Sequence, residues 1–299
     1  MRIYEGSPRQ DFEEVFRSIG AFLDQRGMKD VLLLEAPDGF IVQGLVLSGA
    51  SSGTWSESMG AQTKETLTFL DDRGRELRRF DRVPANPGVN HFLWNRRLPG
   101  ADEVLAKDLE PLPRKDGPLV VPGRYAVRLT LGERSQTQSF EILPDPRVKA
   151  SASDLLAQFT FLKAILAKQV IANATLNEID ALLAQVSALS SRVKERARSA
   201  ALRKAADTLR AELLALRGTM IDVNYSQAQL CGSGLHEKLN ALFDTVDSGD
   251  YAPAQQAREV FAVLSGQLDV VLAKWRDARE RRVPALNRAA IKAKLQVIG

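Results

Sequence analysis

The chain has 299 residues, with 41 Lys and Arg against 37 Asp and Glu, which gives a formal net charge of +4. This length is about twice that of a typical domain and predicts two or three hydrophobic cores. Hydrophobic residues make up 44% of the chain and charged residues 26%, and these values exclude wholesale disorder. The single cysteine, Cys231, excludes an internal disulfide and a cysteine-rich zinc site.

Residues 1–63 predict a small αββ unit followed by a polar linker. Pro8 suits the first position of a helix, and apolar residues at helical spacing continue to Gly27. Two β-rich runs follow, Val31–Glu35 and Phe40–Leu47, separated by a turn that contains Pro and Gly. A unit of this size cannot bury both faces of its hairpin, so we expect it to pack on another domain or on a second chain. Its candidate assembly residues are Val31, Leu33, Phe40 and Val42.

Residues 64–146 predict an antiparallel β-sandwich of the immunoglobulin-like type, because short strands and turn signals follow one another without helical spacing. The clearest strand is Arg124–Leu131, in which Tyr125 and the alternate apolar residues are expected to face the core. Trp94 is a second predicted core residue. We expect the proline-rich connection from Leu98 to Pro122 to run across the surface of the sandwich.

Residues 147–299 change to helical periodicity and predict an antiparallel long-helix bundle, so the whole chain is assigned to the α+β multidomain class. Ser151 begins a helix of about 40 residues, which is either continuous or two nearly collinear helices. Gly218 is expected to end the next helix, and Pro284 to break the last long one. No stretch approaches the roughly 18 apolar residues that cross a bilayer, and Met1–Gln10 has no apolar signal region. The chain is therefore predicted to be cytoplasmic, without a membrane span.

Five segments carry a resemblance to a known family. The segments Val89–Ala101, Gly117–Leu129, Asp145–Arg147, Asp154–Phe159 and Val246–Phe261 resemble the sandwich and helical tail that follow the propeller in bacterial sialidase-like BNR-repeat proteins, also described as sortilin-like glycosyl hydrolases. The similarity covers about residues 64–290. It implies a sandwich followed by helices, and it places the family's hydrolase or ligand-binding face on a propeller that this chain lacks.

The motif that marks such propeller blades is Ser-x-Asp-x-Gly-x-Thr-Trp. Its nearest match here, Ser48–Trp55, has Ala50 in place of Asp and Ser52 in place of Gly. The resemblance therefore transfers no catalytic residue to this chain.

Few residues have the types and spacing of a catalytic or metal site. His91 is predicted in a strand and His236 on a helix of another domain, where each is expected to be structural. The acidic pair at Asp71 is typical of a turn, and the pair at Glu13 suits a helix N-terminus. The triplet that begins at Asn173 matches a glycosylation acceptor by chance. We predict no catalytic residue, no metal ligand and no cofactor.

Positive charge gathers in the second half of the chain. Residues 147–299 hold 22 basic and 15 acidic side chains, against 19 and 22 in residues 1–146. A candidate interaction surface consists of Arg192, Lys194, Arg196, Arg198, Arg203, Lys204, Lys274, Arg276, Arg279, Arg281 and Arg282. Acidic residues are interleaved with these, and Trp275 is their one aromatic neighbour, which favours a solvated helix face over nucleic-acid binding. An acidic protein partner is an intermediate alternative.

These observations favour a non-enzymatic scaffold or assembly subunit, whose partner is another protein or a second copy in a homo-oligomer. Two alternatives remain open. One is a non-catalytic accessory module of a sialidase-like, carbohydrate-active system, as the family resemblance implies. The other is a binder of acidic partners, with nucleic acid possible but not favoured, through the basic helix faces.

Overall fold

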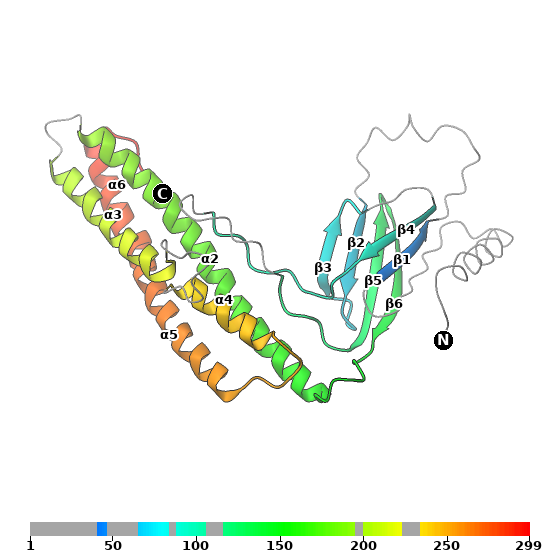
Figure 1. Ribbon diagram of the computed structural model, residues 1–299. Coiled ribbons are helices and arrows are strands. Elements are labelled where there is room, and N and C mark those ends of the chain that lie inside the picture. Colours follow the sequence, from blue (N-terminus) through cyan, green and yellow to red (C-terminus); the bar gives the residue numbers. More distant parts are fainter. Residues whose placement is uncertain (1–40, 47–64, 84–87, 106–115, 195–199, 223–233) are drawn as a thin grey trace, which may run out of the picture. The chain divides into compact units, whose positions relative to one another are not determined.

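A computed structural model describes residues 41–46, 65–83, 88–105, 116–194, 200–222 and 234–299 (Figure 1). The described residues have mixed helix and sheet structure, which agrees with the predicted α+β class. The chain divides into two compact units. The β unit comprises residues up to Arg97 together with Pro122–Asp145, and the helical unit comprises Leu98–Val121 and Pro146–Gly299.

The described strands of the β unit form two antiparallel sheets. Their bounds are β1 Ile41–Val46, β2 Thr66–Leu70, β3 Glu76–Asp81, β4 Gly88–Leu93, β5 Gly123–Leu131 and β6 Arg134–Ile142. The larger sheet has the strand order β3-β2-β5-β6, and the smaller sheet pairs β1 with β4. The β5–β6 hairpin turns at Gly132, whose φ of 59° favours glycine. Its strands then pair from Leu131↔Arg134 to Gly123↔Ile142.

Phe69, on the central strand β2, is the centre of the β-unit core. Its side chain is fully buried, and its ring stacks on Trp94 with 4.0 Å between the ring centroids. Phe92 of β4 also contacts it, so residues of the β1–β4 segment pack on the larger sheet. Tyr125 is buried and lies beside Phe140. The prediction that Trp94 and Tyr125 are core residues is therefore confirmed.

β1 has a partner, β4, that the sequence did not predict. Its residues Ile41–Val46 pair with Gly88–Leu93, in a register that places Val42 opposite Phe92. This strand is therefore tied to the middle of the chain, because a hydrogen-bonded ladder links residues that are far apart in the sequence. The other run of the predicted hairpin, Val31–Glu35, lies outside the described residues, as do Leu33 and Phe40.

The helical unit is arranged along one helix, α2. The bounds are α2 Ala152–Lys194, α3 Ala200–Met220, α4 Leu235–Val246, α5 Gln255–Asp277 and α6 Val283–Lys292. α2 is continuous over 43 residues, about 65 Å at 1.5 Å per residue. Its start has the predicted reciprocal cap, in which the Asp154 backbone N–H donates to Ser151 Oγ and the Ser151 N–H donates to an Asp154 carboxylate oxygen.

The helices share one hydrophobic core, to which α2 contributes over most of its length. Fully buried members include Ile165, Leu176, Ile179, Leu213, Leu239 and Leu268. By length and composition α2 could also cross a membrane, and it alone among the described helices meets that test; 33% of its most apolar window is buried within this fold. The sequence prediction had found no such stretch. In this fold apolar residues of α2 pack in the hydrophobic core, and several of its polar side chains form hydrogen bonds to neighbouring helices.

Two predicted helix ends are wrong. Gly218 lies inside α3, which continues to Met220. Pro284 does not break the helix either. α5 ends at Asp277, before the proline, and a π-helical turn over Ala278–Arg282 leads directly into α6. Pro284 therefore occupies the first turn of α6, where its missing N–H costs little, and the wider turn before it accommodates the proline ring.

The proline-rich segment after Leu98 belongs to the helical unit, so the prediction that it crosses the β-sandwich is wrong. Asn173 Nδ2 donates to Asp102 O over 2.7 Å, and Asn177 Nδ2 donates to Glu103 O over 2.9 Å. The N–H of Leu105 donates to Asn177 Oδ1. Two asparagines of α2 thus satisfy backbone groups of a segment that has no strand partner at these positions.

Tyr125→Ala should lower the free energy of unfolding of the β unit by about 3 kcal/mol or more, because it removes a buried ring that packs on Phe140. Chemical denaturation followed by circular dichroism measures this. Arg124→Ala, at the exposed neighbouring position, is the control and should change stability little. Equal stabilities of the two variants would show that the ring does not contribute to the core.

Gly218→Ala should stabilise the helical unit by about 0.5–1 kcal/mol, because the glycine lies within a helix and an added Cβ would meet nothing within 4 Å. Gly117→Ala should have the opposite effect and destabilise by about 1–3 kcal/mol. Its Cβ would lie 2.5 Å from Pro99 O and 3.0 Å from Leu98 O. Thermal melts of both variants test the pair, and the same sign for both would contradict the packing described here.

Candidate interaction surfaces

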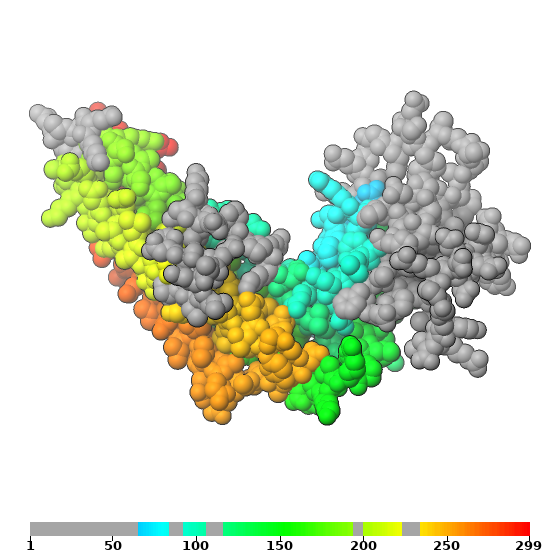
Figure 2. Space-filling model, in the orientation of Figure 1, coloured from blue at the N-terminus to red at the C-terminus, as the bar shows by residue number. Residues whose placement is uncertain are grey.

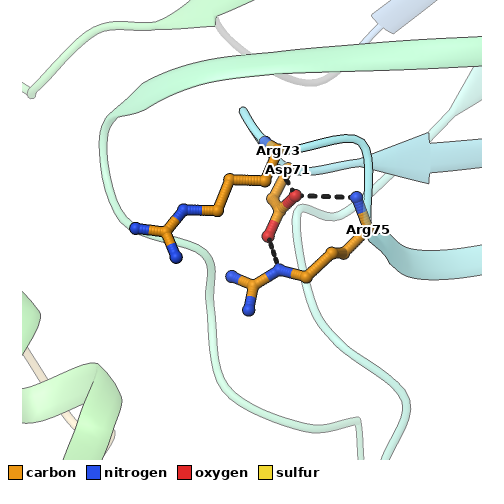
Figure 3. Close-up of polar contacts among 3 residues, drawn as sticks. All are labelled: Asp71, Arg73 and Arg75. Atoms are coloured by element: carbon orange, nitrogen blue, oxygen red, sulfur yellow. Dashed lines mark hydrogen bonds and ion pairs between the residues drawn. The ribbon is translucent and has the colours of Figure 1, made fainter.

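The acidic pair at Asp71 forms a turn, as its sequence predicted (Figure 3). One Asp71 carboxylate oxygen accepts the backbone N–H groups of Arg73 and Arg75 at 3.0 and 2.8 Å. The other accepts Arg75 Nε at 2.6 Å. Burial by itself would raise the pKa of Asp71, but the hydrogen bonds and charge of Arg75 and the N–H of Arg73 outweigh it and hold this pKa below the ordinary 3.8. The carboxylate is used in closing the β2–β3 hairpin.

His236 lies in a buried chain of hydrogen bonds that joins three segments of the helical unit. Because Asn173 Nδ2 donates to Asp102 O, the Asn173 oxygen is left to accept, and His236 Nδ1 donates to it over 2.9 Å. His236 Nε2 then accepts Asn240 Nδ2 over 3.0 Å. Gln169 Nε2 donates to Asn240 Oδ1 over 2.7 Å. This directional order fits a neutral imidazole, both of whose ring nitrogens are engaged.

The network gives His236 and Asn173 structural positions. Asn173 is 7% exposed, so its position in the glycosylation-like triplet has no accessible amide. His91 lies in β4 of the β unit, opposite Gln43, whereas His236 belongs to the helical unit. Among the residues that the structure describes, no group of three or more His, Cys, Asp or Glu side chains is placed to hold a metal ion.

The described residues of the basic clusters make several bonds within the chain. Arg279 contacts Glu178 at 3.2 Å, and Arg282 lies 3.6 and 3.8 Å from Asp277 and Glu212. In the same way Arg281 faces Asp277, Arg203 faces Asp207, and Arg192 donates to Gln296 Oε1. Arg196 and Arg198 lie outside the described residues, as does the side chain of Lys194.

These basic residues fall on different elements. Arg279, Arg281 and Arg282 project from the π-helical turn, whereas Arg203 and Lys204 line an open depression of about 550 Å³ on α3. Exposed ion pairs of this kind are individually weak. They nevertheless balance part of the positive charge of the candidate interaction surface that the sequence predicts.

Two helices carry exposed aliphatic side chains, and one of these, Val170, belongs to the apolar stripe that periodicity predicts for one face of α2. On α2 these are Leu156, Val170 and Ile171, with 44–55% of each residue exposed. On α5 they are Val260, Val263 and Val270, with 46–59% exposed. Figure 2 shows α5, in orange, at the edge of the helical unit. In the sequence, such residues can be recognised as a second apolar row on a helix whose other apolar row fills the core.

Comparison with protein-family models, with curated proteins and with solved structures found no match to this chain. The function must therefore be inferred from the residues themselves.

Asp71→Asn should destabilise the β unit by about 1 kcal/mol at neutral pH, because the amide loses the charge that binds Arg75. A folded-state pKa below 3.8 means that the ionised group stabilises the fold above this pH, and that this contribution is lost as the pH falls further. The difference from the unsubstituted chain should therefore shrink below pH 3.8. Denaturation curves from pH 7 to 2 measure it. Asp72→Asn is the control, and a difference independent of pH would contradict the role of the charge.

Proposed function

We propose that this protein is a non-enzymatic structural subunit that binds other protein chains through its helical unit. The observation that carries the proposal is the pair of adjacent exposed aliphatic residues on α2, Val170 and Ile171. Contiguous apolar surface on a folded protein is typical of interaction sites, because water contact with it is unfavourable.

The inter-helix bonds support a rigid supporting arm, which we propose to be an antiparallel long-helix bundle. Arg217 Nε contacts Asp180 Oδ1 at 2.6 Å, and the Arg217 side chain is only 10% exposed. Trp275 Nε1 donates to Glu178 Oε2 at 3.2 Å. Gln158 Nε2, also buried, donates to Val246 O over 2.7 Å. Each bond joins α2 to a different neighbour, and a charged pair that is partly buried is costly to break.

For the β unit we propose an immunoglobulin-like sandwich. The support is the contact of Phe92 and Trp94, from the β4 segment, with Phe69 of the larger sheet. Such packing of two antiparallel sheets through aromatic residues is the arrangement expected of a sandwich core.

The family resemblance supplies a second candidate, a non-catalytic accessory module of a sialidase-like system. The observation that favours this candidate is that several residues in the segments that carry the resemblance occupy structural positions. Trp94 and Tyr125 are buried, and Tyr251 closes the turn after α4 by donating to Thr245 O at 2.7 Å. Glycan binding by the full chain, measured on an array, distinguishes this candidate from a protein-binding subunit.

The variant Val170→Lys/Ile171→Lys should lose the proteins that crosslink to the full chain, because two charges would replace apolar contact surface. The melting temperature should change by less than about 2 °C, since both residues face solvent. Crosslinking with mass spectrometry measures the binding. Ala205→Lys/Ala215→Lys, at exposed positions of α3, adds the same charge and should retain it. Equal binding by the two double variants would show that α2 is not the contact surface.

A further inference from the structure

α5 presents two different apolar rows on opposite sides. The buried row, Leu264, Leu268, Val271 and Trp275, fills the core of the helical unit. The outer row contains Val263 and Val270, which are 59% and 55% exposed. Gly266 lies between them on the same outer side, and a Cβ built on it would meet nothing within 4 Å.

The outer row repeats every seven residues. Val263 and Val270 are one such pair, and Gly266 and Ala273 are another. These four residues are exposed and alternate at spacings of three and four residues over two heptads. A heptad repeat on an exposed helix face is the pattern of a seam that packs against another helix. A glycine in the seam lets two backbones approach closely.

The charges at the two ends of this row identify the helix that fits it. Glu259 lies at the N-terminal end and Lys274 at the C-terminal end, and both are exposed. Glu259 and Lys274 are equally far along the sequence from the midpoint between Gly266 and Gln267. Val263 and Val270 are also equally far from this midpoint. If the row is reversed and laid on itself, Glu259 faces Lys274, Val263 faces Val270, and Gly266 of each copy faces Gln267 of the other at the centre. A parallel pairing would instead place glutamate beside glutamate and lysine beside lysine.

We propose that the outer face of α5, from Glu259 to Lys274, binds the same face of a second copy of this chain, with the two helices antiparallel about a two-fold axis. Such an isologous contact satisfies both copies with one surface. The inference rests on the proposed protein-binding function and adds a second surface and its partner. One helix pair buries less area than a standard interface, so we expect a weak dimer that forms only at higher protein concentration.

Sedimentation velocity of the full chain, from about 1 to 300 µM, should show a monomer–dimer equilibrium. Gly266→Leu should weaken the dimer at least tenfold, because the side chain would occupy the space where the helices cross. Ile291→Lys is the control: Ile291 is 61% exposed on α6, and its replacement should leave the dimer unchanged. Circular dichroism checks that each variant is folded.

A charge-exchange cycle tests the antiparallel geometry without altering packing. Glu259→Lys and Lys274→Glu should each weaken the dimer about tenfold, because each creates two like-charge contacts across the axis. The double variant Glu259→Lys/Lys274→Glu should restore the original affinity, since the opposite charges again face each other. Raising the salt concentration should reduce the differences among these variants.

A monomer throughout the concentration range would overturn the inference, and so would a dimer that Gly266→Leu and the charge exchange leave unchanged. Failure of the double variant to restore affinity would overturn the antiparallel arrangement. These outcomes are separate from the proposed function, which depends on the crosslinked partners of the α2 variants. Loss of binding by the α2 variant together with unchanged α5 variants would leave the proposed function standing and the α5 dimer rejected.

Discussion

The need to cover one face of α2 along its whole length organises the helical unit. A helix of 43 residues with an apolar face cannot be stable alone in water, because its free energy depends on burial of that face. The other helices supply the cover, and their buried leucines meet those of α2 in one core. The segment around Asp102 lies against the same helix. Each neighbour is thus positioned by its place along α2.

Apolar burial does not by itself fix where each neighbour sits, because it has no direction. The polar side chains of α2 add that direction. Asn173 links the Asp102 segment to His236 of α4, and Asp180 holds Arg217 of α3. Glu178 holds Trp275 of α5. A shift of one of these helices along α2 would leave buried polar groups without their partners, at a cost that exceeds the small change in apolar area.

The same arrangement leaves outer faces that have no structural role within the described residues. The exposed pair on α2 and the exposed row on α5 lie on helices whose opposite sides are fully used in the core. A protein built in this way has a rigid support and apolar contact surfaces. This combination is the physical basis on which we propose a binding role, and it joins the proposed function to the proposed contact between copies.

The α+β class, the start of α2 at Ser151 and the burial of Trp94 and Tyr125 follow from the amino-acid sequence, because capping residues and apolar periodicity act locally. The pairing of β1 with β4 and the position of the segment after Leu98 among the helices follow only from the folded structure. Strand pairing and asparagine-to-backbone bonds link residues about 40 to 70 positions apart, and no local pattern encodes the partner. Gly218 was misjudged for the same reason, since glycine favours a helix end but core packing of Leu216 and Met220 extends the helix past it.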